Sequence, residues 1–304
     1  AWWMTEALPL TATALLPFVV LPLTGVATAQ KTAESYYSPI LFLILGGAFI
    51  ALAIERTGLH RRLALILLRQ VGSQGGGTRL LLAFMLATAL LSTIISNTST
   101  ALIMMPMALA VLAGGGIGDG EQEGLAGALP MGIAFAATIG GLGTIVGSPT
   151  NAIAVGLLDR MLDLKISFAQ WSLFGMPMVL LGVPLAAWII ARVQRVSSHP
   201  FDIAAARAAL GTHEPLSRAE RRLLPLVALI VGLWVIQPLI EPLFPKGGLT
   251  DGTIAIVAAL LLFVIPDGTG RPLLVWQEAD RAPWAVIMMF GGGLALAEGM
   301  SASG

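Results

Sequence analysis

The sequence predicts an all-α polytopic membrane protein, and its composition and charge pattern point to that fold class. Hydrophobic residues fill 56% of the 304 positions and only 11% are charged, against about 25% in a typical soluble domain. The uncharged residues gather into long stretches, several close to the roughly 20 residues that a spanning helix needs. The net charge of zero gives no sign of nucleic-acid binding, and the absence of cysteine excludes disulfides and thiolate metal sites.

Most of these stretches predict ordinary spans, and the arginines between them predict the orientation. Two basic loops, 55–79 and 192–222, are expected on the cytoplasmic side, because positive charge favours that side. Residues 159–165 and 241–251 then fall outside. We therefore expect a multi-pass protein of the cell (inner) membrane, surrounded by lipid. The stretches that predict ordinary spans are Ala7–Gln30, Ser35–Ile54, Ile166–Ala191 and Leu223–Ile240.

Two further stretches differ from ordinary spans. Leu80–Gly118 carries no charge, yet Ser96–Thr100 lies in its middle, which predicts a re-entrant hairpin whose tip stops at membrane depth. Gly124–Leu158 contains Gly140–Thr144 and then Gly147–Asn151, which predicts a helix broken within the membrane. Broken helices near the midplane are typical of a transporter site. The pattern alone leaves open two ordinary helices and a kinked span.

A weak internal repeat supports the same interpretation. Gly46–Ala51 recurs 246 residues later as Gly292–Ala297, and Leu15–Pro22 is echoed at a similar offset by Leu260–Pro266. An odd number of predicted crossings separates the copies, so the repeat is expected to be inverted, as in secondary transporters. The same offset added to Asn97 passes Gly304, so we expect a fragment with an incomplete second repeat.

The polar residues of the hairpin tip and the break are suited to binding ions. A bare cation needs oxygen ligands in place of its hydration shell. Ser92 and Ser96 are four residues apart and would share one helix face, Asn97 adds an amide oxygen, and Gly147 allows close backbone approach. These residues predict a Na⁺ cage. The alternative is that the polar side chains only join helices.

An anion would need hydrogen-bond donors instead. The first N–H groups of the half-helices, the Thr98 and Ser148 hydroxyls and the Asn97 amide could hold a carboxylate. No arginine or lysine lies within either stretch, so pairing with a cation is not expected.

These residues carry a resemblance to a known family. Ser96–Ala101 resembles the hairpin-tip signature of the divalent anion:sodium symporter family, which carries di- and tricarboxylates or sulfate. Further similarities lie at Trp2–Leu10, Gly140–Asn151 and Pro283–Gly293. The resemblance implies an elevator-type transporter, with re-entrant hairpins and broken helices, that works as a homodimer. It implies a sodium site at Ser92, Ser96, Asn97 and Gly147, and substrate contacts at Asn97, Thr98, Ser148 and Pro149.

The expected organisation follows from the spans and the resemblance. Residues 1–34 would form a first span, 35–79 a scaffold span with a cytoplasmic surface helix, and 80–165 the transport domain. Residues 166–248 would form scaffold spans with a basic loop, and 249–304 the start of the second inverted repeat. The predicted function is sodium-coupled uptake of dicarboxylates such as succinate or malate, with Na⁺ as the co-transported ion and no organic cofactor.

Several alternatives stay open at this point. A transporter of the same fold could carry sulfate or citrate, or exchange dicarboxylates without sodium. Gly116–Asp119 matches a pattern of intramembrane aspartyl proteases. However, Asp119 lies in a glycine-rich acidic loop, and the uncharged stretches supply no second aspartate for catalysis. We therefore do not expect an enzyme.

Overall fold

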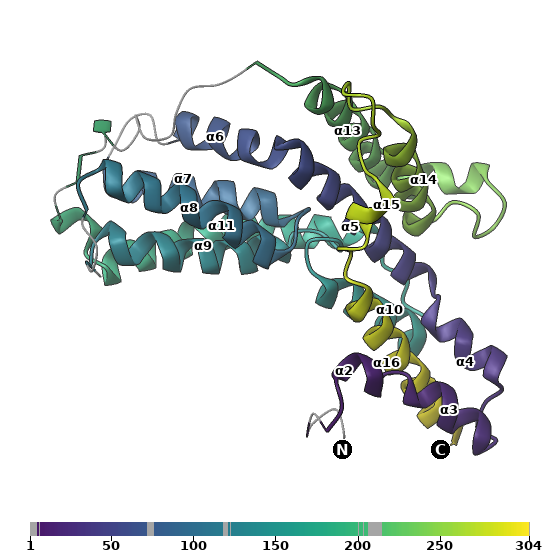
Figure 1. Ribbon diagram of the computed structural model, residues 1–304. Coiled ribbons are helices and arrows are strands. Elements are labelled where there is room, and N and C mark those ends of the chain that lie inside the picture. The colour runs from purple at the N-terminus through teal and green to yellow at the C-terminus, as the bar shows by residue number, and fades with distance from the viewer. Residues whose placement is uncertain are drawn as a thin grey trace. The chain divides into compact units, whose positions relative to one another are not determined.

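The protein is helical throughout the part that the computed structural model describes (Figure 1). That part comprises Thr5 and residues 7–71, 76–117, 121, 123–199, 201–202, 204–205 and 215–303. Trp2, Trp3, Gly118 and Asp119, on which expectations rested, lie outside it. The helices are α2 Leu10–Thr13, α3 Leu16–Leu23, α4 Ala29–Tyr36, α5 Pro39–Thr57, α6 Leu59–Val71, α7 Gly77–Ser92, α8 Asn97–Gly114, α9 Leu125–Gly141, α10 Pro149–Leu162, α11 Phe168–Val193, η1 Val196–Ser198, α13 Arg218–Ile240, η2 Glu241–Leu243, α14 Asp251–Val264, α15 Trp276–Ala279 and α16 Trp284–Ser303.

The all-α membrane fold is confirmed, with one correction. Within the described residues, the helical segments long and apolar enough to cross a membrane include Ala29–Thr57, Phe168–Val193 and Arg218–Leu243, as expected. The expected span over Ala7–Gln30 is wrong, because that stretch divides into the short helices α2 and α3. Proline is the cause: Pro17 occupies the first turn of α3, where its missing N–H is tolerated, and Pro22 lies inside the helix.

The chain divides into two compact units, each assembled from separate segments. Unit 1 contains Ala1–Ala53, Pro149–Ala169 and Pro225–Gly304, and unit 2 contains Ile54–Ser148 and Gln170–Leu224. This division groups residues by contact, whereas the predicted domains group them by expected motion. The predicted domain boundaries therefore stay a prediction.

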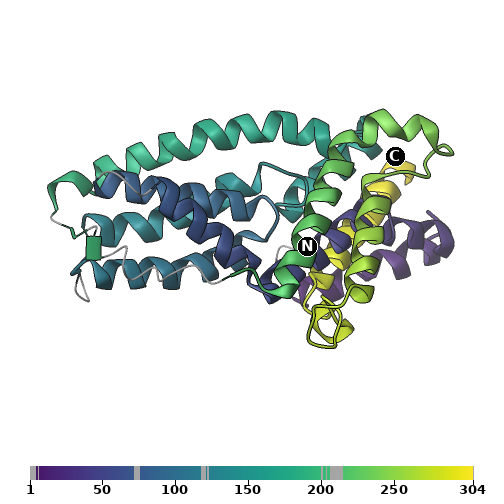
Figure 2. The ribbon, with the colours of Figure 1, turned by 90° about the horizontal axis from the view of Figure 1, so that it is seen from above.

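Unit 2 is a bundle with a dense apolar core. Figure 2 shows α7, α8 and α9 lying side by side. Phe84, Leu81 and Met85 of α7 are fully buried against Leu129 and Ile133 of α9. Inside lipid such side chains gain little from leaving water, so this core stabilises the bundle mainly through close packing. This core holds the ends of the short helices in a fixed position.

Helices α7 and α8 form the expected helical hairpin, which turns at residues 93–96. Both of its open ends contact the segment after α11: a Cβ on Gly77 would lie 2.9 Å from Val196 Cγ1, and Asp202 N donates to the Gly115 carbonyl at 3.3 Å. With 16 residues, α7 is about 24 Å long, less than the roughly 30 Å hydrocarbon core, whereas the 18-residue α8 is long enough to cross. The contacts of both open ends with one segment of unit 2 are what support a hairpin that leaves the membrane on the side where it entered.

A buried ion pair joins the two basic loops within unit 2. Arg62 Nε and Nη2 donate to the two carboxylate oxygens of Glu220 at 2.7 and 3.0 Å. Glu220 is buried and also accepts from Ser217 N at 2.7 Å. Arg62 lies in loop 55–79 and Glu220 in loop 192–222. The two loops therefore lie on one side of the membrane, as the predicted orientation requires.

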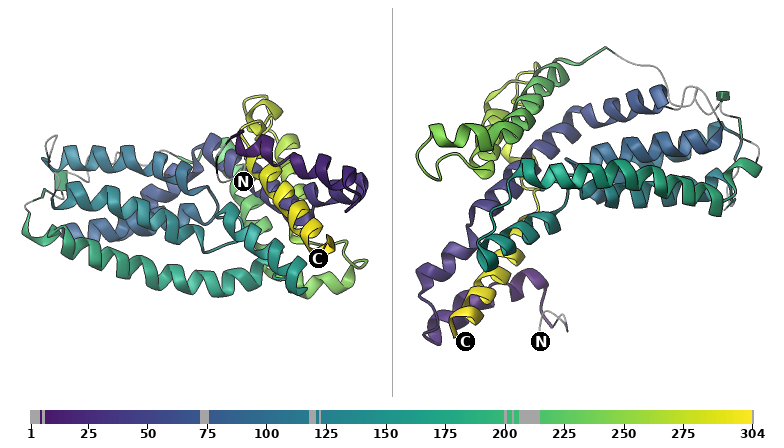
Figure 3. Two further views of the ribbon diagram at one scale, coloured as in Figure 1. Left: turned by 90° about the horizontal axis from the view of Figure 1, so that it is seen from below. Right: turned by 180° about the vertical axis from the view of Figure 1, so that it is seen from behind.

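Unit 1 carries the structural trace of the internal repeat. A Cβ on Gly46 of α5 would lie 2.6 Å from the backbone of Ala255 in α14, and a Cβ on Gly292 of α16 would lie 2.2 Å from the Ala14 carbonyl next to α2. Each repeat's glycine helix therefore packs on the opening helices of the other repeat. In Figures 1 and 3, α5 runs away from α4 while α16 runs from α15 toward the C label. The two helices run in opposite directions, which supports an inverted repeat.

The close glycine contacts make a stability prediction. We expect Gly46→Ala and Gly292→Ala each to destabilise the protein by about 1–3 kcal/mol, because the added methyl overlaps backbone atoms that cannot move aside. Gly232→Ala in α13 is the matched control: its Cβ meets nothing within 4 Å, so the alanine should be neutral or slightly stabilising. Thermal unfolding in detergent, followed by tryptophan fluorescence, measures all three. Equal melting temperatures for the three variants would contradict this packing.

Candidate functional site

Two helix ends and one glycine form the centre of the candidate site. Helix α7 ends at Ser92 and α9 ends at Gly141, and the last carbonyls of a helix lack intrahelical donors. A Cβ on Gly147 would lie 2.7 Å from the Gly141 carbonyl oxygen, 2.9 Å from that of Ser92 and 3.1 Å from that of Thr93. Three backbone carbonyls therefore converge on Gly147, and only glycine allows this approach. The negative ends of the two helix dipoles also favour a cation here.

Ser92 connects these carbonyls to the hairpin tip. Its hydroxyl oxygen is 2.7 Å from Asn97 Oδ1 and 2.8 Å from the Ala137 carbonyl oxygen. The side chain is fully buried. A hydroxyl has one proton, so it can satisfy only one of these two acceptors at a time. The Ser92 hydroxyl thus faces two acceptor oxygens with one proton, an arrangement that a cation could complete.

Thr144 connects the two chain breaks, a role that was not predicted from the sequence. Its hydroxyl donates to the Thr93 carbonyl in the hairpin turn, and it accepts from Gly147 N at 3.0 Å. It is buried. Thr144 is therefore a positioning residue that sets the distance between the two breaks. The only hint in the sequence was its place within the glycine-rich run 140–144.

Ser96 lies close by but not where its spacing from Ser92 suggested. The two serines do not share a helix face, because α7 ends at Ser92 and Ser96 is the N-cap of α8. The Ser96 hydroxyl accepts from Ser99 N at 3.2 Å and is exposed. In the described part of the chain no hydrogen bond joins it to Ser92 or Asn97. The helix-face argument for pairing the two serines is wrong, and the sodium role of Ser96 stays a prediction.

The predicted substrate contacts lie around the start of two helices. Asn97 is half-buried and Thr98 is exposed, both in the first turn of α8, where backbone N–H groups have no intrahelical partner. Ser148 is half-buried directly before α10. Pro149 begins α10 and belongs to unit 1, whereas the other predicted site residues belong to unit 2. The structure brings Ser92, Asn97 and Gly147 together, and it describes Pro149 only as the start of its helix.

The available ligands fit an alkali-metal ion. Backbone carbonyls, a hydroxyl and an amide are neutral oxygen donors, and unwound backbone with helix C-termini is how transporters coordinate Na⁺. Among the described residues, no cluster of histidine and acidic side chains offers a transition-metal site. A carboxylate would instead meet the N–H groups of α8.

Comparison with known proteins agrees with this chemistry. The model of the citrate transporter family matches residues 1–304. The sodium-dependent dicarboxylate transporter SdcS of Staphylococcus saprophyticus is 37% identical over 317 residues. The proteins of the same name from Staphylococcus aureus strains USA300 and bovine RF122 are 35% and 36% identical over 319 residues. Each alignment covers 100% of this chain and 60% of the relative, so the chain spans 60% of the length of these relatives.

These matches decide between the classes of protein left open by the sequence. The relatives are named as transporters and not as enzymes, which removes the protease alternative. The resemblance to the divalent anion:sodium symporters is confirmed, and the apolar helices agree with a multi-pass location in the cell membrane. The chain, with its hairpin tip and broken helix meeting at Gly147, belongs to the citrate transporter family.

Proposed function

We propose that the complete gene product carries dicarboxylates, such as succinate or malate, into the cell together with Na⁺. The observation that carries this proposal is the convergence of three backbone carbonyls on Gly147 beside a Ser92 hydroxyl that faces both Asn97 Oδ1 and the Ala137 carbonyl. The name of the SdcS relatives, sodium-dependent dicarboxylate transporter, supports both the ion and the substrate.

In this proposal Asn97 couples the two ligands. When Na⁺ binds Asn97 Oδ1, the Ser92 hydroxyl keeps its proton and donates it to the Ala137 carbonyl, and its oxygen is left to contact the ion. The ion draws Asn97 Oδ1 toward the carbonyls around Gly147. Because its oxygen is held by the ion, the Asn97 side-chain amide has one orientation, and its NH₂ group points in a fixed direction. Together with the α8 N–H groups, Thr98, Ser148 and Pro149, it would receive a substrate carboxylate. Sodium thereby prepares the anion site before the substrate binds.

Charge sets the sodium requirement. A dianion entering a negative interior moves against the membrane potential, at roughly 2.3 kcal/mol per charge per 100 mV. With two Na⁺ the step is electroneutral, and with more than two it is driven inward by the potential. We propose the latter. The second sodium site would come from the second repeat.

We also propose an elevator-type movement within a homodimer, with residues 80–165 as the moving transport domain and residues 35–79 and 166–248 as scaffold. The resemblance to the divalent anion:sodium symporters supports this proposal. The contact-based units follow other boundaries, because they place residues 54–148 and 170–224 together.

Citrate is the second candidate substrate, because the family description names it. Sulfate and sodium-independent exchange remain alternatives for the same site. Competition separates the substrates: excess malate, citrate or sulfate is added to a succinate uptake assay. Inhibition by malate alone supports a dicarboxylate site, and equal inhibition by citrate would extend it to tricarboxylates.

The first prediction concerns Asn97. The complete gene product in liposomes should take up radiolabelled succinate with an inward Na⁺ gradient but not with choline, and Asn97→Ala should lose this uptake because both ligands lose a contact. Thr138→Val is the control, since the Thr138 hydroxyl is exposed and bonds only to the carbonyl one turn before it. Sodium-independent uptake stimulated by internal dicarboxylate would show an exchanger and overturn the symport proposal.

The second prediction concerns Ser92. Ser92→Ala removes one ligand from the ion and leaves the carbonyls in place. Hydrogen bonds and contacts to charged groups are worth about 1.5–3 kcal/mol, so the Na⁺ concentration for half-maximal uptake should rise by about 10–100-fold. The maximal rate at saturating Na⁺ should change much less. An unchanged Na⁺ dependence in the folded variant would exclude Ser92 as a ligand.

The third prediction concerns Thr144. Thr144→Val keeps the shape of the side chain but loses both hydrogen bonds, so Na⁺ affinity should fall. Thr144→Ser keeps the hydroxyl and should restore the Na⁺ dependence of the wild type. A purely structural role would instead lower the melting temperature of both variants without this split. Thr138→Val again serves as the control.

A further inference from the structure

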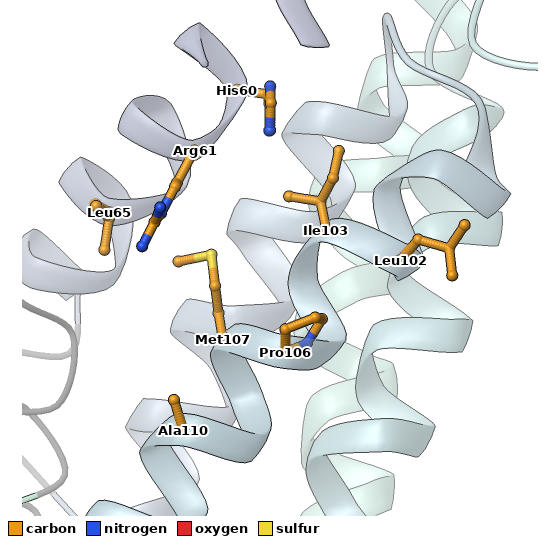
Figure 4. A pocket seen from close by; sticks show the side chains of 8 residues that line it. All are labelled: His60, Arg61, Leu65, Leu102, Ile103, Pro106, Met107 and Ala110. Atoms are coloured by element: carbon orange, nitrogen blue, oxygen red, sulfur yellow. The ribbon is translucent and has the colours of Figure 1, made fainter. Parts of the chain in front are cut away.

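A groove in unit 2 lies apart from the hairpin tip and has no role in the proposed function. It lies between α6 and α8 and has a volume of about 390 Å³. Figure 4 shows its lining: two basic or polar side chains from the start of α6 stand above apolar side chains. The lining residues are His60, Arg61, Leu65, Leu102, Ile103, Pro106, Met107 and Ala110.

The α8 wall of the groove is apolar and open. Leu102, which lines it, is 71% exposed. Helix α8 is one of the helices long and apolar enough to cross a membrane. Pro106, Ile103 and Met107 of α8 complete this wall with apolar side chains.

The open end of the groove carries a positive charge without a partner. Arg61 is exposed, and within the described residues its side chain makes no hydrogen bond or ion pair. By contrast, its neighbour Arg62 is held by Glu220. His60 Nδ1 lies 3.0 Å from the Ile54 carbonyl oxygen. Because a carbonyl only accepts, Nδ1 carries the proton, and Nε2 is the atom left for a ligand.

We propose that this groove binds one anionic phospholipid of the cytoplasmic leaflet, with Arg61 on the phosphate and the acyl chain along Leu65, Leu102 and Met107. The His60 ring, held through Nδ1 on the Ile54 carbonyl, leaves Nε2 for a headgroup hydroxyl, which suits phosphatidylglycerol. Basic pockets beside spanning helices on the cytoplasmic side bind anionic headgroups, and loop 55–79 is the predicted cytoplasmic side. A similar groove in unit 1, of about 380 Å³, is lined only by apolar residues and glycine, so it offers no charge for such a headgroup.

The test measures lipid retention directly. The complete gene product is purified in detergent, mixed with phosphatidylglycerol or phosphatidylcholine of the same acyl chains, and analysed by native mass spectrometry. Wild type should retain phosphatidylglycerol in preference. Arg61→Gln should weaken this by about fivefold, as expected for one basic residue at an anionic surface. Arg218→Gln, which removes another exposed arginine of the basic loops, should leave it unchanged.

Two further arms separate the lipid from other occupants. Ala110→Trp fills the apolar end without changing charge and should also reduce retention. Glycerol phosphate, which has the headgroup chemistry without the chains, should not displace the lipid at millimolar concentration. Retention that survives both Arg61→Gln and Ala110→Trp overturns the proposal. If glycerol phosphate displaces the lipid, the groove binds a soluble phosphate instead. If wild type carries a second copy of the protein that Ala110→Trp loses, the groove is a dimer interface. Either result overturns the proposal.

Discussion

The rest of the structure depends on one constraint: a helix that ends inside a membrane leaves carbonyls that must find a partner. Here α7 and α9 end facing the same point, and Gly147 leaves room for their carbonyls to meet. Thr144 fixes the separation of the two breaks, and the Ser92 proton is shared between two acceptors. The proposed cation would complete this arrangement without a charged side chain. The core of unit 2 holds these helix ends in place.

Unit 1 meets a different requirement with small residues. Apolar helices gain little from the hydrophobic effect inside lipid, so close contact between backbones becomes the main source of stability. Gly46 and Gly292 provide it in the two repeats, each against the opposite repeat. The packing that relates the repeats is therefore the same packing that stabilises the unit.

Much of the fold could be predicted from the sequence, because charge and proline mark where helices can lie. The hairpin over 80–118 and the break at 142–148 follow from uncharged length interrupted by polar residues and glycine. The predicted span over Ala7–Gln30 is wrong because it rested on apolar composition alone, whereas Pro17 and Pro22 keep the helices of this stretch short. The helix-face pairing of Ser92 and Ser96 failed because the helix ends between them. Thr144 was missed because its role depends on Thr93, 51 residues earlier, and no local pattern reports such a contact.

Because each unit is assembled from separate segments of the chain, the units cannot complete their contacts at the same time during synthesis. Unit 2 is complete once Leu224 has left the ribosome, whereas α5 cannot meet Ala255, nor Ala14 meet Gly292, until much later. The opening helices therefore stay in the bilayer without their partners, and their small residues remain uncovered, while unit 2 is synthesised and folds. Contacts this distant in sequence form slowly, and a waiting segment is open to wrong partners. The insertion machinery thus meets its most vulnerable intermediate between the synthesis of residues 225 and 292.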